Sequence, residues 1–113
     1  MARILVVDDD DQVRRFYQLI LEGEGHQITL VSNGFEAIIA LEKNTFDLVL
    51  TDYDMPKMKG DELALEIKDK NPTLPIVMVT GSEFPESADV NYFVAKPVSP
   101  PVLLAITKSL FGK

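Results

Sequence analysis

The chain has 113 residues, a length that supports one domain with a single hydrophobic core. Its 46% hydrophobic and 26% charged residues are ordinary for a globular domain, and no apolar run is long enough to span a bilayer. The absence of cysteine excludes disulfides and thiol catalysis, and the net charge of -7 disfavours direct binding to nucleic acid. The start has no signal-peptide or transit-peptide pattern, so we expect one cytoplasmic domain over residues 1–113 without membrane contact.

Segments with strand character alternate with helical stripes along the chain. The first strand is expected over Arg3–Val7, and apolar residues spaced three or four apart from Val13 onward predict a helix that ends at Gly23 or Gly25. Four further strands are expected within the segments HQITLVSNG, FDLVLTD, IVMVTG and YFVAKP. Further helices are expected around residues 37–41, over residues 60–69, and after Ser99, which can cap the last one.

This alternation predicts a parallel sheet with helices on both faces, because parallel strands need crossover connections and those connections are right-handed. Ligands of such sheets bind outside the carboxyl ends of the strands. Polar side chains follow four of the predicted strands, and they are Asp8, Asp9, Asp52, Thr80 and Lys96. If the first, third and fourth strands are neighbours, these side chains meet at one edge of the sheet.

Three carboxylates at one edge raise one another's pKa, and a hard divalent cation relieves this repulsion. A small set of oxygen ligands suits Mg²⁺, which keeps water ligands and completes its coordination with a substrate phosphate. The Thr80 hydroxyl and the Lys96 ammonium would suit the oxygens of that phosphate. One of the carboxylates can act as a nucleophile and become an aspartyl-phosphate.

The order of these motifs resembles the receiver domain of bacterial two-component response regulators, of the single-domain kind found in chemotaxis. The motifs are Asp-Asp after the first strand, DxxMP with a glycine four residues later, Thr after the fourth strand and Lys-Pro after the fifth. Together they cover the whole chain. The resemblance implies a flavodoxin-like α/β fold with strand order 2-1-3-4-5, and a phosphoacceptor domain with Mg²⁺ as its cofactor.

The resemblance also assigns roles to the acidic residues. Asp52 corresponds to the phosphoacceptor, Asp9 to the direct metal ligand and Asp8 to its partner. Asp54 stands where the family supplies a backbone carbonyl to the metal. The acidic run continues beyond these positions, and its last two residues fit the charge expected at a helix N-terminus. Those two residues are Asp10 and Asp11.

A second group of residues matches the family's switch. Thr80 resembles the switch hydroxyl and Phe93 the switch aromatic, although phenylalanine lacks the hydroxyl that a tyrosine would offer. Lys96 resembles the lysine that binds the phosphate, and the resemblance implies a cis peptide at Lys96-Pro97. The only histidine, His26, has no ligand types near it in the sequence and is interpreted as a loop residue rather than a phosphotransfer group.

Two features depart from the family pattern. Lys59 stands before the motif glycine, where the family more often has a small or acidic residue, and places a positive charge near the mouth of the site. The segment between Thr80 and Lys96 is too short for the full fourth helix of the family and contains Pro85. We therefore expect a fourth helix that is short or absent, and a monomer or weak dimer.

The resemblance implies that a histidine kinase or a phosphotransfer protein supplies the phosphoryl group. The chain is then no enzyme, apart from catalysing its own phosphorylation and dephosphorylation. Since the sequence carries no effector domain, output is expected through another protein, or the chain acts as a phosphate relay or sink. The sequence identifies neither the downstream partner nor the process controlled.

Two other interpretations remain open. The segment DYD, residues 52–54, also resembles the aspartate pair of haloacid-dehalogenase-type phosphatases. Those enzymes place the pair after the first strand and use additional sequence to build a substrate pocket, and the chain has neither feature. The other alternative is a receiver-like interaction module that is no longer phosphorylated. The presence of every residue type of the phosphorylation site argues against this alternative.

Overall fold

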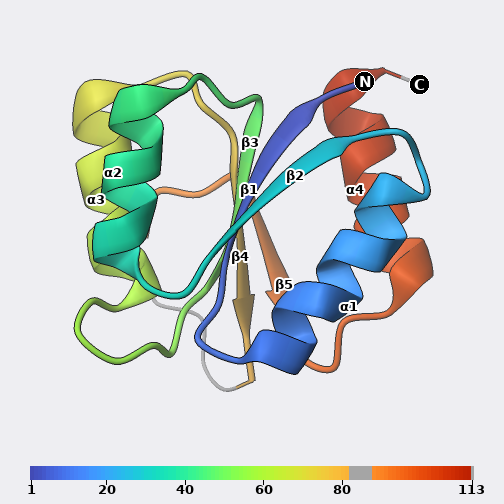
Figure 1. The fold of residues 1–113 in the computed structure, drawn as a ribbon, viewed down its shortest axis with the longest axis horizontal. Helices are drawn as coiled ribbons and strands as arrows, with labels where there is room; N and C mark the ends of the chain where they lie inside the picture. The colour runs from blue at the N-terminus through green and yellow to red at the C-terminus, as the bar shows by residue number, and fades with distance from the viewer. Residues whose placement is uncertain (82–87, 113) are drawn as a thin grey trace.

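The computed structural model describes residues 1–81 and 88–112. Its centre is a parallel sheet of five strands in the order β2-β1-β3-β4-β5, as predicted. Figure 1 shows the sheet between two layers of helices. The strands are β1 (Arg3–Val7), β2 (Gln27–Val31), β3 (Leu48–Asp52), β4 (Ile76–Thr80) and β5 (Tyr92–Ala95).

The four described helices cover both faces of the sheet, as the alternation predicts. In Figure 1, α1 and α4 lie on one side of the sheet, and α2 and α3 lie on the other. None of the helices in the described ranges has the length and hydropathy that a bilayer crossing requires. The helices are α1 (Asp11–Glu22), α2 (Gly34–Lys43), α3 (Gly60–Lys70) and α4 (Pro100–Phe111).

The central strands are buried on both faces, which explains their continuous apolar sequences. All five residues of β3 and all five residues of β4 are buried. Neighbouring side chains of a strand point to opposite faces, so Leu50 packs in the core below α1 and α4, and Val49 packs in the core below α2 and α3. The two cores hold the strands in register, and the register fixes where each strand ends.

Side-chain caps set the helix starts. Asp10 is the N-cap of α1, and its carboxylate accepts hydrogen bonds from the backbone N–H groups of Gln12 and Val13. Ser99 caps α4 as predicted and accepts from the N–H of Val102, with Pro100 in the first turn. The interpretation of the late acidic run as helix N-terminal charge is therefore confirmed.

The connection between β4 and β5 is described only in part. Gly81 and residues 88–91 are not helical. Residues 82–87 lie outside the described residues. The prediction of a short or absent fourth helix falls mostly on these residues. Ala88 and Val90 are partly buried against the core below α2 and α3, together with Phe93 of β5.

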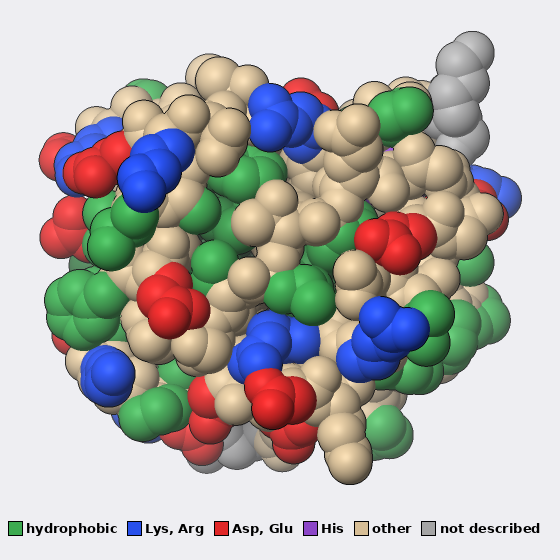
Figure 2. Space-filling model, viewed as in Figure 1, with side chains coloured by type: hydrophobic (Ala, Val, Ile, Leu, Met, Phe, Trp, Pro, Cys, Tyr) green, Lys and Arg blue, Asp and Glu red, His purple; other side chains and the backbone are tan. Residues whose placement is uncertain are grey.

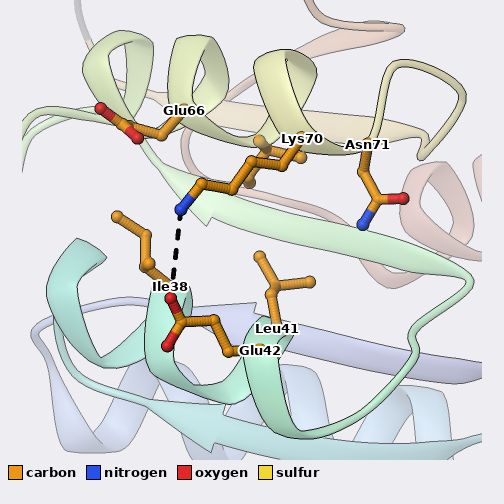
Figure 3. Close-up of a pocket in the computed structure, with 7 residues that line it drawn as sticks. Ile38, Leu41, Glu42, Glu66, Lys70 and Asn71 are labelled. Atoms are coloured by element: carbon orange, nitrogen blue, oxygen red, sulfur yellow. Dashed lines mark ion pairs between the residues drawn. The ribbon is translucent and has the colours of Figure 1, made fainter.

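A small pocket of about 50 Å³ lies between α2 and α3. Figure 3 shows Ile38 and Leu41 of α2 on either side of the ion pair that joins Glu42 to Lys70 of α3. The ammonium nitrogen and the carboxylate oxygen of this pair are 4.0 Å apart. The pocket lies at the C-terminal ends of the two helices. It is therefore near the amino ends of the strands and away from their carboxyl ends.

The surface carries both signs of charge despite the net charge of -7. Figure 2 shows acidic and basic side chains interspersed on one face of the molecule, with apolar side chains between them. The surface charge on this face is therefore mixed in sign. Asp8 and Asp52, in contrast, are acidic residues that are buried.

Candidate functional site

The carboxyl ends of four neighbouring strands meet at one edge of the sheet. Asp8 and Asp9 follow β1, Asp52 ends β3, and the register pairs Asp52 with Val79 of β4. Thr80 in turn pairs with Ala95, the residue before Lys96. The structure thus brings the predicted side chains to one edge, which are those of Asp8, Asp9, Asp52, Thr80 and Lys96.

Three of these residues form a carboxylate cluster. Asp8, Asp9 and Asp52 each offer one oxygen, and these oxygens all lie within 4.8 Å of one another. Asp8 is 1% exposed and Asp52 is 3% exposed, whereas Asp9 is exposed. The cluster therefore opens to solvent on the Asp9 side and is closed by the protein on the other.

Burial makes the ionised cluster unfavourable without a cation. Desolvation is the main cause that raises the pKa of Asp8 to about 6, and the nearby charge of Asp52 adds to it. Desolvation also raises the pKa of Asp52, although Lys96 opposes it. A cation bound among these oxygens would hold both groups ionised.

The buried oxygens have unused capacity to accept hydrogen bonds or bind a metal. Asp8 Oδ1 accepts from the backbone N–H of Asp10 at 2.9 Å. Within the described residues, Asp8 Oδ2 and Asp52 Oδ1 accept no hydrogen bond. Buried carboxylate oxygens without donors are rare because leaving them so is costly. Together with the exposed Asp9, they form an oxygen donor set that fits a hard divalent cation.

Lys96 supplies the positive charge of the site. Its Nζ lies 3.0 Å from Asp52 Oδ1 in a close ion pair. Burial disfavours the ammonium, but its interaction with Asp52 outweighs this effect and raises the pKa of Lys96. The Lys96-Pro97 peptide bond is cis, which confirms that expectation, and the N–H of Lys96 donates to the carbonyl of Thr80 at 2.9 Å.

Thr80 and Phe93 lie on neighbouring strands near this edge. Thr80 ends β4 and is buried, and Phe93 on β5 pairs in register with Met78. Phe93 is half-buried and packs toward the core below α2 and α3. These positions suit the switch implied by the resemblance, and the roles of both residues stay predictions.

The loop after β3 requires glycine at one position. The N–H of Gly60 donates to the carbonyl of Tyr53 at 2.8 Å. A Cβ atom at Gly60 would come within 2.5 Å of the Asp52 carbonyl oxygen and 2.7 Å of the Tyr53 Cα. The motif glycine is therefore needed because the start of α3 lies directly against the backbone that carries Asp52.

Asp54 and Lys59 form an ion pair that sequence reasoning missed. Lys59 Nζ lies 2.7 Å from Asp54 Oδ1. The Asp54 side chain is exposed and does not belong to the carboxylate cluster. The predicted metal contact of Asp54 concerned its backbone carbonyl and stays a prediction. The chain separation could have suggested the pair, because a turn of this length can bring the two side chains together.

A buried tyrosine beneath the site was also missed. Tyr17 of α1 is buried, and its pKa is raised by desolvation first and then by the charges of Asp8 and Asp52. It lines an open groove of about 640 Å³ beside Lys96 and Pro97. The helical spacing of Tyr17 identified it as a core residue, but gave no sign that its ring lies near the carboxylates.

The chain also matches the model of a known protein family. The family model described as the response regulator receiver domain matches residues 4–108. The chain belongs to this family. The receiver domain is a signalling domain of two-component systems, so the resemblance stated from the sequence is confirmed at the level of the family.

Two curated relatives illustrate the match. The response regulator receiver protein CpdR of Brucella abortus is 42% identical over 81 residues, which cover 72% of the chain and 68% of CpdR. The transcriptional regulatory protein ResD of Bacillus subtilis is 36% identical over 118 residues, covering 99% of the chain. The chain spans only 49% of ResD, so this relative is a longer protein.

Solved structures of receiver domains share the fold closely. The receiver domain of a signal transduction histidine kinase from Syntrophus aciditrophicus has a TM-score of 0.93 and 29% identity, with 99% of the chain and 91% of that domain covered. The response regulator TrrA of Thermotoga maritima, solved in complex with Mg²⁺ and BeF, has a TM-score of 0.90 and 32% identity. Coverage is 97% of the chain and 99% of TrrA.

Proposed function

We propose that Asp52 is the phosphoacceptor of this receiver domain and takes its phosphoryl group from a phosphohistidine of a kinase or phosphotransfer protein. The observation that carries the proposal is the position of Asp52. Its carboxylate is buried, retains an oxygen without a hydrogen-bond donor, lies 3.0 Å from Lys96 and shares one cluster with Asp8 and Asp9. A nucleophile, its counter-charge and a set of metal ligands thus occupy one small volume.

The transfer exchanges one bond to phosphorus for another. An Asp52 oxygen forms a bond to phosphorus while the bond from phosphorus to the donor nitrogen breaks, and the donor histidine keeps the electron pair. Lys96 places positive charge beside the acceptor oxygen. Thr80 follows Val79, the register partner of Asp52, and in this proposal its hydroxyl would donate to a phosphoryl oxygen.

Asp8, Asp9 and Asp52 are the residues that would hold Mg²⁺, with the Asp54 carbonyl as a further ligand. When bound, Mg²⁺ supplies positive charge that offsets the negative charge of the carboxylates and the phosphoryl oxygens. The raised pKa of Asp8 supports this assignment, as does its buried Oδ2, which accepts no hydrogen bond within the described residues. The complex of the relative TrrA with Mg²⁺ and BeF supports it from the family side.

Phosphorylation is proposed to shift the packing near β5. The phosphoryl group would draw the Thr80 hydroxyl toward the site and leave room into which Phe93 turns. Because phenylalanine has no hydroxyl, packing alone would hold the inward state. The measurement is the set of NMR shifts around Phe93 on loading with phosphate. We expect Thr80→Ala to remove them while Asp52 is still phosphorylated, and unchanged shifts would contradict this coupling.

Intact-mass measurement with acetyl phosphate tests the assignment of Asp52. We expect one added phosphoryl group in the presence of Mg²⁺, no addition with a chelator, and no addition in Asp52→Asn. The matched control is Asp69→Asn, an exposed carboxylate on α3, which should label as the parent does. Labelling that persists in Asp52→Asn, or that needs no divalent cation, would refute the proposal. A parent chain that takes no label would favour the unphosphorylated module.

The phosphatase alternative has no structural support. In haloacid-dehalogenase-type enzymes the second carboxylate of the pair serves as the general acid, but Asp54 is ion-paired with Lys59 and lies outside the cluster. We propose instead that the chain catalyses only its own phosphorylation and dephosphorylation. Its output through another protein, its cytoplasmic location and its monomeric or weakly dimeric state belong to the same proposal.

A further inference from the structure

The loop between β1 and α1 carries two members of the carboxylate cluster and is held by hydrogen bonds on both sides of Asp9. Before Asp9, the N–H of Asp8 donates to the carbonyl of Val31 at 3.2 Å. After Asp9, the N–H of Asp10 donates back to Asp8 Oδ1 at 2.9 Å, and the Asp10 carboxylate caps α1. Asp9 is the exposed member of the cluster, but it stands on a backbone whose neighbours are both bonded.

Arg14 reaches back from α1 to this loop. Its Nη1 donates to the backbone carbonyl of Asp8 at 2.5 Å, and its Nη2 is ion-paired with Asp11 in the first turn of the helix. The Arg14 side chain is only 15% exposed. A guanidinium presents its donors in a rigid planar fork. The two arms of this fork therefore tie the residue that follows β1 to the start of α1.

We propose that Arg14 is a positioning residue for the metal site, which holds the backbone so that Asp8 and Asp9 present their carboxylates together. This inference rests on the proposed magnesium site. The carbonyl that Arg14 binds belongs to the planar peptide unit that joins Asp8 to Asp9. The orientation of this unit sets the direction in which the Asp9 side chain leaves the backbone. The close grouping of the three carboxylate oxygens therefore depends on it.

Position and charge can be separated by the choice of substitution and of cation. A lysine keeps the positive charge of Arg14, but one ammonium cannot reproduce the fork that binds two partners. A role through charge alone would therefore leave Arg14→Lys unchanged. Mg²⁺ demands near-octahedral coordination, whereas Ca²⁺ accepts a flexible geometry. A loop that is held less firmly should therefore weaken the binding of Mg²⁺ more than that of Ca²⁺.

Titrations of the protein with Mg²⁺ and with Ca²⁺, followed by backbone amide shifts in NMR spectra, test this role. We expect Arg14→Lys to weaken Mg²⁺ binding about ten-fold, the lower end of the loss for residues that orient metal ligands. The affinity for Ca²⁺ should fall by a smaller factor. Arg15→Lys is the matched control on the same helix. Arg15 is exposed and donates to Gln18 at 3.3 Å, so its replacement should leave both affinities unchanged.

Hydrogen exchange in the metal-free protein reports on the loop independently of the cation. The N–H of Asp10, which is bonded to Asp8 Oδ1, should exchange faster in Arg14→Lys than in the parent. The N–H of Leu50, at the centre of β3, should keep its parent rate and so show that the variant is folded. A uniform increase at both amides would mean general destabilisation and would contradict a role in positioning.

The outcomes separate the role of Arg14 from the site on which it rests. Parent-like Mg²⁺ binding in Arg14→Lys, an equal loss in Arg15→Lys, or equal losses for Mg²⁺ and Ca²⁺ would overturn this role. Each of these results would leave the assignment of the metal ligands intact. A parent chain that binds no Mg²⁺ would refute the magnesium site and this inference with it, and hydrogen exchange would still show whether Arg14 holds the loop.

Discussion

Polar side chains lie at both ends of the parallel sheet, but they serve different purposes there. At the amino end, Asp47 Oδ2 accepts from the N–H of Arg3 at 2.8 Å, and Asn91 Oδ1 accepts from the N–H of Ile76 at 2.9 Å. These two side chains pair backbone groups at the start of β1 and β4 that would otherwise lack a ladder partner. They contribute to stability.

At the carboxyl end the buried polar groups retain unused capacity. Asp8 Oδ2 and Asp52 Oδ1 accept no hydrogen bond within the part of the chain that the structure describes, and burial raises the pKa of both carboxyls. The contrast shows that one end of the sheet is optimised for folding, whereas the other keeps a destabilising arrangement that a cation and a phosphoryl group can use. Four substitutions test this contrast, in order of decreasing effect.

Gly60→Ala should have the largest effect. The added Cβ would come within 2.5 Å of the Asp52 carbonyl oxygen, so either the start of α3 or the backbone of β3 must move. We expect a loss of about 3 kcal/mol in the free energy of unfolding, at the upper end for overpacking. Denaturant unfolding is the measurement. Gly81→Ala is the control, because its Cβ would have its nearest contact at 3.7 Å and should change little.

Asp8→Asn should stabilise the protein when Mg²⁺ is absent. The folded-state pKa of Asp8 is raised from 3.8 to about 6, so the ionised group destabilises the fold above pH 6. By the relation between pKa and free energy, the gain from neutralising it at pH 8 is about 2–3 kcal/mol. The difference in the free energy of unfolding between the variant and the parent should therefore disappear as pH falls from 6 toward 4. Urea unfolding at several pH values measures it.

Magnesium provides the control for Asp8. Added Mg²⁺ should stabilise the parent, since a ligand that binds the native state alone raises its stability, and should stabilise Asp8→Asn less. If Asp8→Asn lowers stability at pH 8 without Mg²⁺, the carboxylate is already satisfied. In that case the two ends of the sheet do not differ as described.

His26→Ala tests the opposite end and should destabilise. His26 Nδ1 accepts from the N–H of Ala2 at 3.0 Å, and its ring lies 5.8 Å from the ring of Phe111. Loss of this hydrogen bond should cost about 1 kcal/mol. Burial lowers the pKa of His26 from 6.5, so the parent should lose stability as pH falls below 6.5, and the variant should lose less. Thermal unfolding of the parent and the variant across that pH range is the measurement.

Lys57→Asn should have the smallest effect. Lys57 is a non-glycine residue with a positive φ of 73°, in the loop that carries the acceptor. Asparagine adopts the left-handed region more readily than lysine, so we expect a gain of about 0.5 kcal/mol in the free energy of unfolding. Lys43→Asn, at the end of α2, is the control and should give no gain. A loss of stability in Lys57→Asn would show that the lysine side chain stabilises the loop.

The sequence predicted most of the fold because its apolar runs and its polar residues are local features. The strand over Arg3–Val7 agrees with the structure in both bounds, and the capping role of Ser99 is confirmed. The site followed from two general rules, namely that parallel strands end at one edge and that ligands bind there. The sheet order required the family resemblance, since periodicity gives no information on which strands are neighbours.

The features that were missed depend on contacts across turns and between layers. The side chain of Lys59 reaches Asp54 across a loop, and the side chain of His26, just before β2, reaches the backbone of Ala2, just before β1. The local sequence pattern predicts that each of these residues lies outside the strands. It does not predict which groups their side chains contact. The requirement for Gly60 likewise arises from how closely α3 packs against Tyr53.

The central place of β1 has a consequence for how the chain folds as it is synthesised. β1 is made first, yet it pairs with β2 on one side and with β3 on the other. One of its edges therefore stays open until residue 52 has left the ribosome, and β5 adds the last strand of the sheet only after residue 95. An open edge can pair with a foreign strand, so the nascent domain is exposed to aggregation until β3 has emerged and paired with β1.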